Sequence, residues 1–174
     1  MGRKGEKQKM NYIVEKAVKL SHCSDSRNPF EICNSIGVNV VFADIGELKG
    51  MYKYIKRNRY IVISDKLDER TARTVCAHEL GHDVLHRNFA KNGFWREYTL
   101  FGTDGKQEYE ANLFAAELLI SDGDILELLH CTTEEIASNL NIDKNLICIK
   151  LSSMNKRGYN FGEFTYRSDF LGNF

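Results

Sequence analysis

The stretch TVCAHELGHDVLHR, residues 74–87, contains three of the five histidines in this 174-residue chain. They are His78, His82 and His86, and their four-residue spacing places them one turn apart on the same side of a helix. Glu79 follows the first of them directly. Apolar residues alternate with these polar ones at helical spacing. The stretch therefore predicts a helix that buries one face and carries a row of imidazoles on another.

Two of the three histidines, with Glu79, form the pattern H-E-x-x-H. Both His78 and His82 can point a ring nitrogen at one zinc ion, at about 2.0–2.1 Å. Zinc lowers the pKa of a bound water to about 7, so a hydroxide-like nucleophile is available at neutral pH. Glu79 can take the proton of that water and pass it to a leaving group. The pattern predicts His78 and His82 as ligands and Glu79 as general base.

His86 does not fit the same metal ion. On a straight helix it lies about 12 Å along the axis from His78, at a rise of about 1.5 Å per residue. Pairing with His82 instead would leave Glu79 one turn from the water. The glycine that turns the chain back before the third histidine of metzincins is also missing. We expect a helix that ends near His86, with this side chain close to the unpaired carbonyls there.

A catalytic zinc needs a third protein ligand, and the segment EYEANLFAAELL at residues 108–119 supplies candidates. At 100° per residue, Glu110 lies on the same side as Leu113 and Phe114, and Glu108 nearly opposite. A carboxylate on a core-facing side is costly unless something compensates its charge, as a metal does. We therefore predict Glu110 as the third ligand and a solvated Glu108.

Glu117 is the rival to Glu110 because it lies on the same side, about 10 Å further along the helix. It could be a ligand, it could hydrogen-bond to a liganding histidine, or it could form an ion pair with an arginine such as Arg73. The sequence leaves these alternatives open.

Composition narrows the class of protein. The chain has 43% hydrophobic residues, which suits one compact domain, and 24 basic residues balance 24 acidic ones, which argues against a dedicated nucleic-acid binder. Five cysteines without a C-x-x-C pair suggest free thiols in a reducing compartment. No apolar stretch follows the basic first residues, so we expect no signal peptide, and no stretch approaches the ~18 apolar residues of a membrane span. We expect a cytoplasmic protein.

Hydrophobic periodicity predicts an α+β fold. The predicted strands form a small antiparallel sheet, with Asn58 at positive φ in the hairpin turn; they span residues 38–44, 50–56 and 59–64. The predicted helices surround it at residues 10–22, 30–36, 68–86 and 107–120, with short helices after Ser121 and Thr132 and a last one at 143–158. We expect a disordered segment at 1–9, one domain at 10–158 and a tail at 159–174.

Substrate contacts are expected in two places. A peptide could add a strand to an edge of the sheet. The long loop at residues 88–106 carries aromatic residues that suit a subsite wall or lid, namely Phe94, Trp95, Tyr98 and Phe101. The candidates for stabilising an oxyanion are Tyr98, Tyr109 and Tyr166, and nothing in the sequence separates them.

The segments AHELGHDVLH and EYEANLFAAELLI together resemble the ImmA/IrrE family of metallopeptidases. That family pairs a helix of the form H-E-L-G-H-x-x-L-H with a later helix of the form E-x-x-A-N-x-F-A-A-E-L-L. The resemblance implies a zincin-like fold, in which the sheet packs on the H-E-x-x-H helix and a mostly helical part follows. It also implies Zn²⁺ held by His78, His82 and Glu110, with Glu79 as the base.

The same resemblance implies a function. Family members cleave or inactivate repressor-type transcription regulators of phages and integrative elements, so we expect a zinc endopeptidase whose partner is a helix-turn-helix repressor. Two positions depart from the pattern. Ile120-Ser121 replaces Met-Pro, and Phe114 stands four residues after Glu110, where thermolysin-like enzymes have a carboxylate. The group that orients His82 is therefore open, with Glu117 as one candidate.

A second interpretation concerns residues 131–158, which resemble a helix-turn-helix. It predicts a DNA-binding regulator with a structural or sensory zinc, although the neutral net charge argues against direct contact with nucleic acid. Its local basic residues are Lys144, Lys150, Lys156 and Arg157. In a third interpretation the protein sequesters a repressor without cutting it. The family resemblance instead lets these helices complete the core or dock the repressor.

Overall fold

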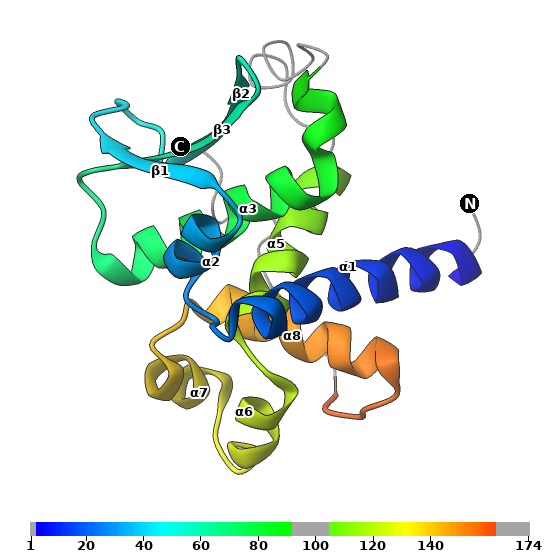
Figure 1. The fold of residues 1–174 in the computed structure, drawn as a ribbon. Coiled ribbons are helices and arrows are strands. Elements are labelled where there is room, and N and C mark those ends of the chain that lie inside the picture. The colour runs from blue at the N-terminus through cyan, green and yellow to red at the C-terminus, as the bar shows by residue number, and fades with distance from the viewer. Residues whose placement is uncertain (1–2, 92–104, 163–174) are drawn as a thin grey trace.

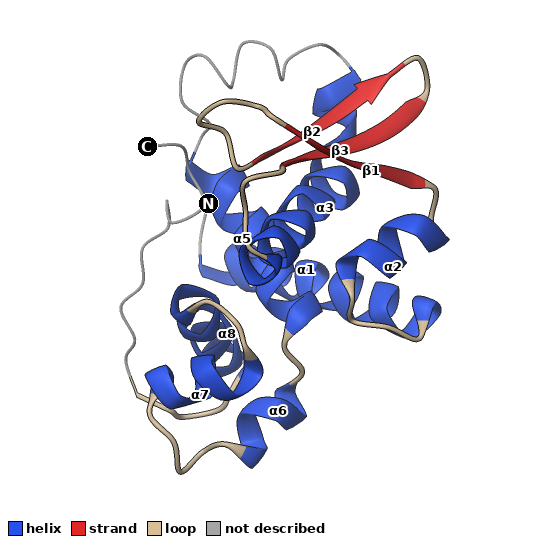
Figure 2. Ribbon diagram, turned by 90° about the vertical axis from the view of Figure 1, so that its left-hand side faces the viewer, coloured by secondary structure: helices blue, strands red, loops and turns tan. Residues whose placement is uncertain are grey.

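The computed structural model describes residues 3–91 and 105–162, and it confirms the α+β class (Figure 1). Five elements precede the H-E-x-x-H helix: α1 Arg3–Ser24, α2 Pro29–Ser35, β1 Val38–Ala43, β2 Gly50–Ile55 and β3 Asn58–Ser64. That helix and those after it are α3 Glu69–Lys91, α5 Gly105–Leu119, α6 Asp122–Glu127, α7 Thr133–Leu140 and α8 Lys144–Arg157. The sheet lies at one end, next to α3, and α6 to α8 lie at the other end (Figure 2).

The hairpin between β2 and β3 is antiparallel, as predicted, and its turn has two residues. Lys56 and Arg57 occupy the turn with φ values of 48° and 67°. Positive φ at both central residues is the requirement of a type I′ turn, whose twist matches that of the strands. The prediction of positive φ at Asn58 was wrong, because Asn58 already pairs with Ile55 as the first residue of β3.

The first strand departs from the predicted antiparallel arrangement. The strand order is β1-β3-β2, and β1 runs parallel to β3 with Val38 opposite Arg59. The sheet is therefore mixed. Burial explains the order, since β3 carries the fully buried Ile61 and Ile63 and takes the centre, whereas β1 exposes Val41 and Phe42 and takes an edge.

Helix α3 begins where the sequence predicts and ends later. Asp68 caps it, because its Oδ1 accepts a hydrogen bond from the backbone N–H of Thr71 at 2.9 Å. The helix continues to Lys91, five residues past the predicted end, and no glycine or proline interrupts residues 87–91. His86 is thus an interior residue of α3, and the prediction that it interacts with terminal carbonyls was wrong.

Helix α1 also differs from expectation. It starts at Arg3, so residues 3–9, predicted to be disordered, are helical. Lysine, glutamate and glutamine are good helix formers, and they extend the helix beyond the apolar face that defined the prediction. That face does bury Met10, Ile13 and Ala17.

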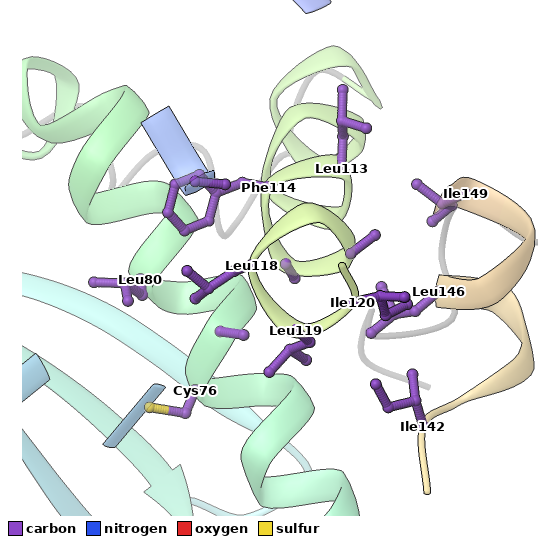
Figure 3. Packing of buried hydrophobic residues seen from close by; sticks show 14 of the residues in the cluster. Cys76, Leu80, Leu113, Phe114, Leu118, Leu119, Ile120, Ile142, Leu146 and Ile149 are labelled. Atoms are coloured by element: carbon purple, nitrogen blue, oxygen red, sulfur yellow. The ribbon is translucent and has the colours of Figure 1, made fainter. Parts of the chain in front are cut away.

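The core is centred on α5, which is buried from Glu110 to Leu119 without an exposed position. Figure 3 shows Leu80 of α3 and Leu118 of α5 in the same packing layer, while Leu146 and Ile149 of α8 face α5 from the other side. The helix therefore has buried faces toward α3, α1 and α8. A projection that assumes one core-facing side cannot describe it.

The sequence identified several local signals correctly. The predicted capping box of Thr132 and Glu135 begins α7, and a second one with Ser121 begins α6. Gly37 and Gly158 take positive φ at the ends of α2 and α8. All five cysteines are free thiols. None of the helices in the described ranges is long and apolar enough to cross a membrane.

Candidate metal centre

His78 and His82 face one another on adjacent turns of α3. Their Nε2 atoms are 3.1 Å apart, and both side chains are buried. Glu108, in the first turn of α5, completes the group. Its Oε2 is 3.2 Å from Nε2 of His78, and its Oε1 is 3.4 Å from Nε2 of His82. Two imidazoles and a carboxylate thus converge on one point.

This group has the geometry of a metal site. One donor atom from each residue lies within 4.8 Å of the others. Ligands at about 2.0–2.1 Å from a tetrahedral zinc are separated from one another by about 3.3 Å, close to the separations observed here. Nitrogen and carboxylate oxygen are donors that zinc accepts. His78, His82 and Glu108 can therefore hold a metal ion.

Gly81 brings the two helices close enough for this arrangement. A Cβ atom at Gly81 would lie 3.1 Å from Cα and 3.2 Å from the carbonyl oxygen of Ala111. Those separations are too short for an unstrained contact, so a side chain would force α5 away from α3. The glycine between Glu79 and His82 thus allows Glu108 to reach the imidazoles.

Glu110, the predicted third ligand, is not part of this group. Its Oε2 is 3.1 Å from Nε2 of His86, and its Oε1 is 2.5 Å from Nζ of Lys9. The prediction that Glu108 is solvated was wrong. Face projection failed because α5 packs on several sides, so that Glu108 reaches the imidazole pair while Glu110 reaches His86 and Lys9 of α1.

The sequence did contain a signal for Glu108. In the motif E-x-x-A-N the first glutamate precedes the Ala-Asn pair by three residues, and Ala111-Asn112 places it at position 108. The fourth residue after Glu108 is then Asn112. Its Oδ1 is 2.8 Å from Nδ1 of His78, so Asn112 occupies the orienting position that is filled by a carboxylate in thermolysin-like enzymes.

Glu79 lies between the imidazoles and the sheet. The backbone N–H of Tyr52, in β2, donates a hydrogen bond to its carboxylate. Burial, reinforced by the charge of Glu108 and opposed by that of His78, raises the pKa of Glu79 to about 7. A carboxyl group with a pKa near neutrality suits both the uptake and the release of a proton.

Close packing leaves no room for a side chain beside Glu79. A Cβ at Gly50, the first residue of β2, would overlap Cγ1 of Val75 and lie 3.3 Å from Oε1 of Glu79. Glycine at this position therefore lets β2 pass directly over the carboxylate.

The other pKa shifts arise from burial and from the charges that these side chains present to one another. Burial lowers the pKa of His82 to about 4, which keeps its ring neutral as metal binding requires. Burial also disfavours charge on His78, but the carboxylates of Glu108 and Glu79 outweigh it and the pKa rises. Burial alone would raise the pKa of Glu108, but hydrogen bonds with both imidazoles hold it well below its usual range.

Glu117 belongs to a different cluster, on the side of α5 that faces α8. Its Oε2 accepts from Nζ of Lys150 at 2.6 Å, and Arg157 lies 3.5 Å from its Oε1. Both basic side chains also pair with Asp122. Glu117 therefore contacts neither a liganding histidine nor Arg73 in any ion pair of the described residues.

The same cluster weakens the DNA-binding interpretation. Lys150 is buried, Arg157 is held by Asp122, and Lys144 pairs with Glu134. Helix α8 buries most of its length against the core. The helix-turn-helix-like segment thus completes the core, and most of its basic groups are already engaged.

Of the predicted substrate-side aromatic residues, only Tyr109 is among the residues that the structure describes. Phe94, Trp95, Tyr98, Phe101 and Tyr166 lie outside the described residues. Tyr109 is described, and its hydroxyl accepts a hydrogen bond from Lys156 at 3.2 Å.

The raised pKa of Glu79 predicts how the stability of the metal-free protein depends on pH. Because the folded pKa of about 7 exceeds the unfolded value near 4.5, this group's contribution is full below pH 4.5 and is lost as pH rises through 7. The metal-free Glu79→Gln variant should therefore be more stable than wild type at pH 8, on the order of 3 kcal/mol. Thermal unfolding of chelator-treated proteins at pH 4.5 and 8 measures this. A difference between variant and wild type that is the same at both pH values would contradict it.

Comparison with known proteins provides independent evidence on the family of this chain. A peptidase family profile described as an IrrE N-terminal-like domain matches residues 33–152. An uncharacterised immunity region protein 2 of Bacillus phage phi105 is 48% identical over 96 residues, which cover 55% of this chain and 60% of that protein. Metallopeptidase ImmA of Bacillus subtilis strain 168 is 28% identical over 155 residues, 87% of this chain and 86% of that protein.

Proposed function

Because the chain belongs to the family of IrrE N-terminal-like peptidases, we propose that it is a zinc-dependent endopeptidase. The proposed ligands are His78, His82 and Glu108, and the proposed general base is Glu79. The convergence of two imidazoles and one carboxylate beside a buried glutamate carries this proposal. The small sheet packed on the H-E-x-x-H helix is consistent with the zincin-like fold of the family.

In this proposal the metal, Glu79 and Asn112 have separate roles in peptide hydrolysis. A zinc ion held by these three groups would supply a water of lowered pKa and Lewis-acid polarisation of a peptide carbonyl. Glu79 takes a proton from the attacking water as its oxygen bonds to the carbonyl carbon. Glu79 then delivers that proton to the amide nitrogen as the C–N bond breaks. Asn112 holds the ring of His78 in place.

Strand β2 is the proposed platform for the substrate backbone. It is an edge strand of the described sheet, and the backbone of Tyr52 already reaches Glu79. An extended peptide that pairs with this edge would place its carbonyl groups beside the general base. The opposite edge strand, β1, is separated from β2 by β3 and therefore lies further from the contact between Tyr52 and Glu79.

We propose a helix-turn-helix repressor of a phage or mobile element as the substrate. The relatives support this proposal, because one is a phage immunity region protein and the other is named a metallopeptidase. A repressor of this kind works in the cytoplasm, where the five free thiols would stay reduced.

Removing the metal tests the proposal. We expect purified protein to cleave the repressor encoded beside its gene, to lose that activity after dialysis against a chelator, and to regain it with one equivalent of Zn²⁺. Gel electrophoresis and mass spectrometry of the fragments provide the measurement. Cleavage that persists in fully metal-free protein would exclude the metallopeptidase mechanism. Loss of repressor–DNA binding without fragments would instead support sequestration.

A further inference from the structure

A chain of polar contacts leads from His82 to the N-terminal helix. Nδ1 of His82 is 3.2 Å from Nδ1 of His86. Nε2 of His86 is 3.1 Å from Oε2 of Glu110, and Oε1 of Glu110 is 2.5 Å from Nζ of Lys9. His82, His86 and Glu110 are buried, whereas the Lys9 side chain is 49% exposed. The contacts join three helices, α3, α5 and α1.

The protons in this chain have one consistent arrangement when His82 is a ligand. A metal takes the lone pair of Nε2 of His82, so the ring proton resides on Nδ1 and is donated to Nδ1 of His86. The proton of His86 is then on Nε2 and is donated to Glu110. Lys9 donates to the other oxygen of the same carboxylate. Every contact is thus a hydrogen bond with one donor and one acceptor.

We propose that His86 and Glu110 are positioning residues, which act through His82 to set its ring orientation and tautomer, and that Lys9 anchors Glu110. This inference rests on the proposed metal site. It explains why both side chains are buried. A buried carboxylate such as Glu110 needs compensating hydrogen-bond donors, and His86 and Lys9 provide them. Lys9 comes from α1, which precedes the residues 33–152 that match the family. Helix α1 thereby supplies the last link of the chain.

Zinc affinity measured by competition with a chromogenic chelator tests the role of His86 in the full-length protein. His86→Leu removes the acceptor for His82, and loss of such a partner costs about 10–100-fold in metal affinity. His86→Asn keeps an acceptor near the position of Nδ1 and should restore most of that loss. A leucine variant with wild-type affinity, or an asparagine variant as weak as the leucine one, would overturn the proposal.

Two substitutions of Glu110 provide a second test of the positioning role, which applies even if His86→Leu does not fold. Glu110→Ala removes the acceptor for His86 and should weaken zinc binding by about tenfold. Glu110→Gln retains it and should stay within about two- to fivefold of wild type. Equal zinc affinities for the alanine variant and wild type would reject the positioning role of Glu110.

Lys9 is tested against a matched lysine on the same helix. Because it is half-exposed, Lys9→Met should weaken zinc binding by only about two- to fivefold. Lys7→Met changes an exposed lysine two residues away and should have no effect. Equal effects of the two substitutions would remove Lys9 from the chain of contacts.

A Glu108→Gln variant measured alongside separates this inference from the proposed function. If it binds zinc like wild type, the proposed ligand set fails. If it loses zinc while His86→Leu and Glu110→Ala keep full affinity, the ligand set stands and only the positioning role is rejected.

Discussion

Glu79→Gln is expected to cut the repressor about 10²–10⁴ times more slowly than wild type, the usual contribution of a general acid–base group. Glutamine has nearly the same shape as glutamate but cannot take up the proton of the attacking water. Glu79 is buried against β2 and beside His78, and the other carboxylate whose charge acts on it, Glu108, is a proposed metal ligand. Initial rates of fragment formation at equal zinc occupancy measure the effect.

The control for this variant is its metal content. Glu79 is not a proposed ligand, so the variant should bind one zinc ion with an affinity near that of wild type. Glu47→Gln changes an exposed glutamate before β2 and should leave the rate unchanged. Full activity of Glu79→Gln would refute the assignment of Glu79 as the base. If wild type and Glu79→Gln inactivated the repressor equally and neither produced fragments, proteolysis would be refuted.

Glu108→Gln is expected to weaken zinc binding by about 100-fold or more. A four-ligand structural zinc site is worth about 10–16 kcal/mol, so one ligand contributes about 3 kcal/mol, or roughly 100-fold. A neutral amide is a poor substitute for the carboxylate that lies 3.2 and 3.4 Å from the two imidazole nitrogens. Competition with a chromogenic chelator measures the change.

Glu110→Gln is the matched comparison, because it makes the same chemical change two residues away on the same helix. The amide oxygen can still accept the hydrogen bond from His86, so zinc affinity should fall by only about two- to fivefold. The reverse ranking, with a large loss at Glu110 and a small one at Glu108, would restore the ligand set first predicted from the sequence.

Local patterns were sufficient to predict most of the helices and strands and three of the four residues of the proposed site. Helical spacing identified α3 and its pair of histidines, and capping residues marked the starts of α3 and α7. These signals act between residues within one or two turns, so they can be read without knowing what packs against them. The end of α3 was predicted five residues too early, at His86. The residues that follow contain no glycine or proline to stop the helix.

Contacts between segments that are distant in the sequence could not be predicted from such local patterns. The parallel pairing of β1 with β3 depends on which strand takes the centre of the sheet, and β3 does so with Ile61 and Ile63 fully buried. The role of His86 depends on Glu110, 24 residues away in the sequence. The choice between Glu108 and Glu110 depends on the angle at which α5 crosses α3, and a helical projection contains no information about that angle.

The sequence by itself determined that His78 and His82 share one side of a helix, because a four-residue spacing has that consequence in any fold, and that Glu79 directly follows the first of them. Only the tertiary structure decided which carboxylate meets them. Gly81 lets α5 approach at Ala111, and this contact brings the first turn of α5, with Glu108, to the imidazoles. The next turn then directs Glu110 to His86 and α1, because α5 is packed on several sides at once.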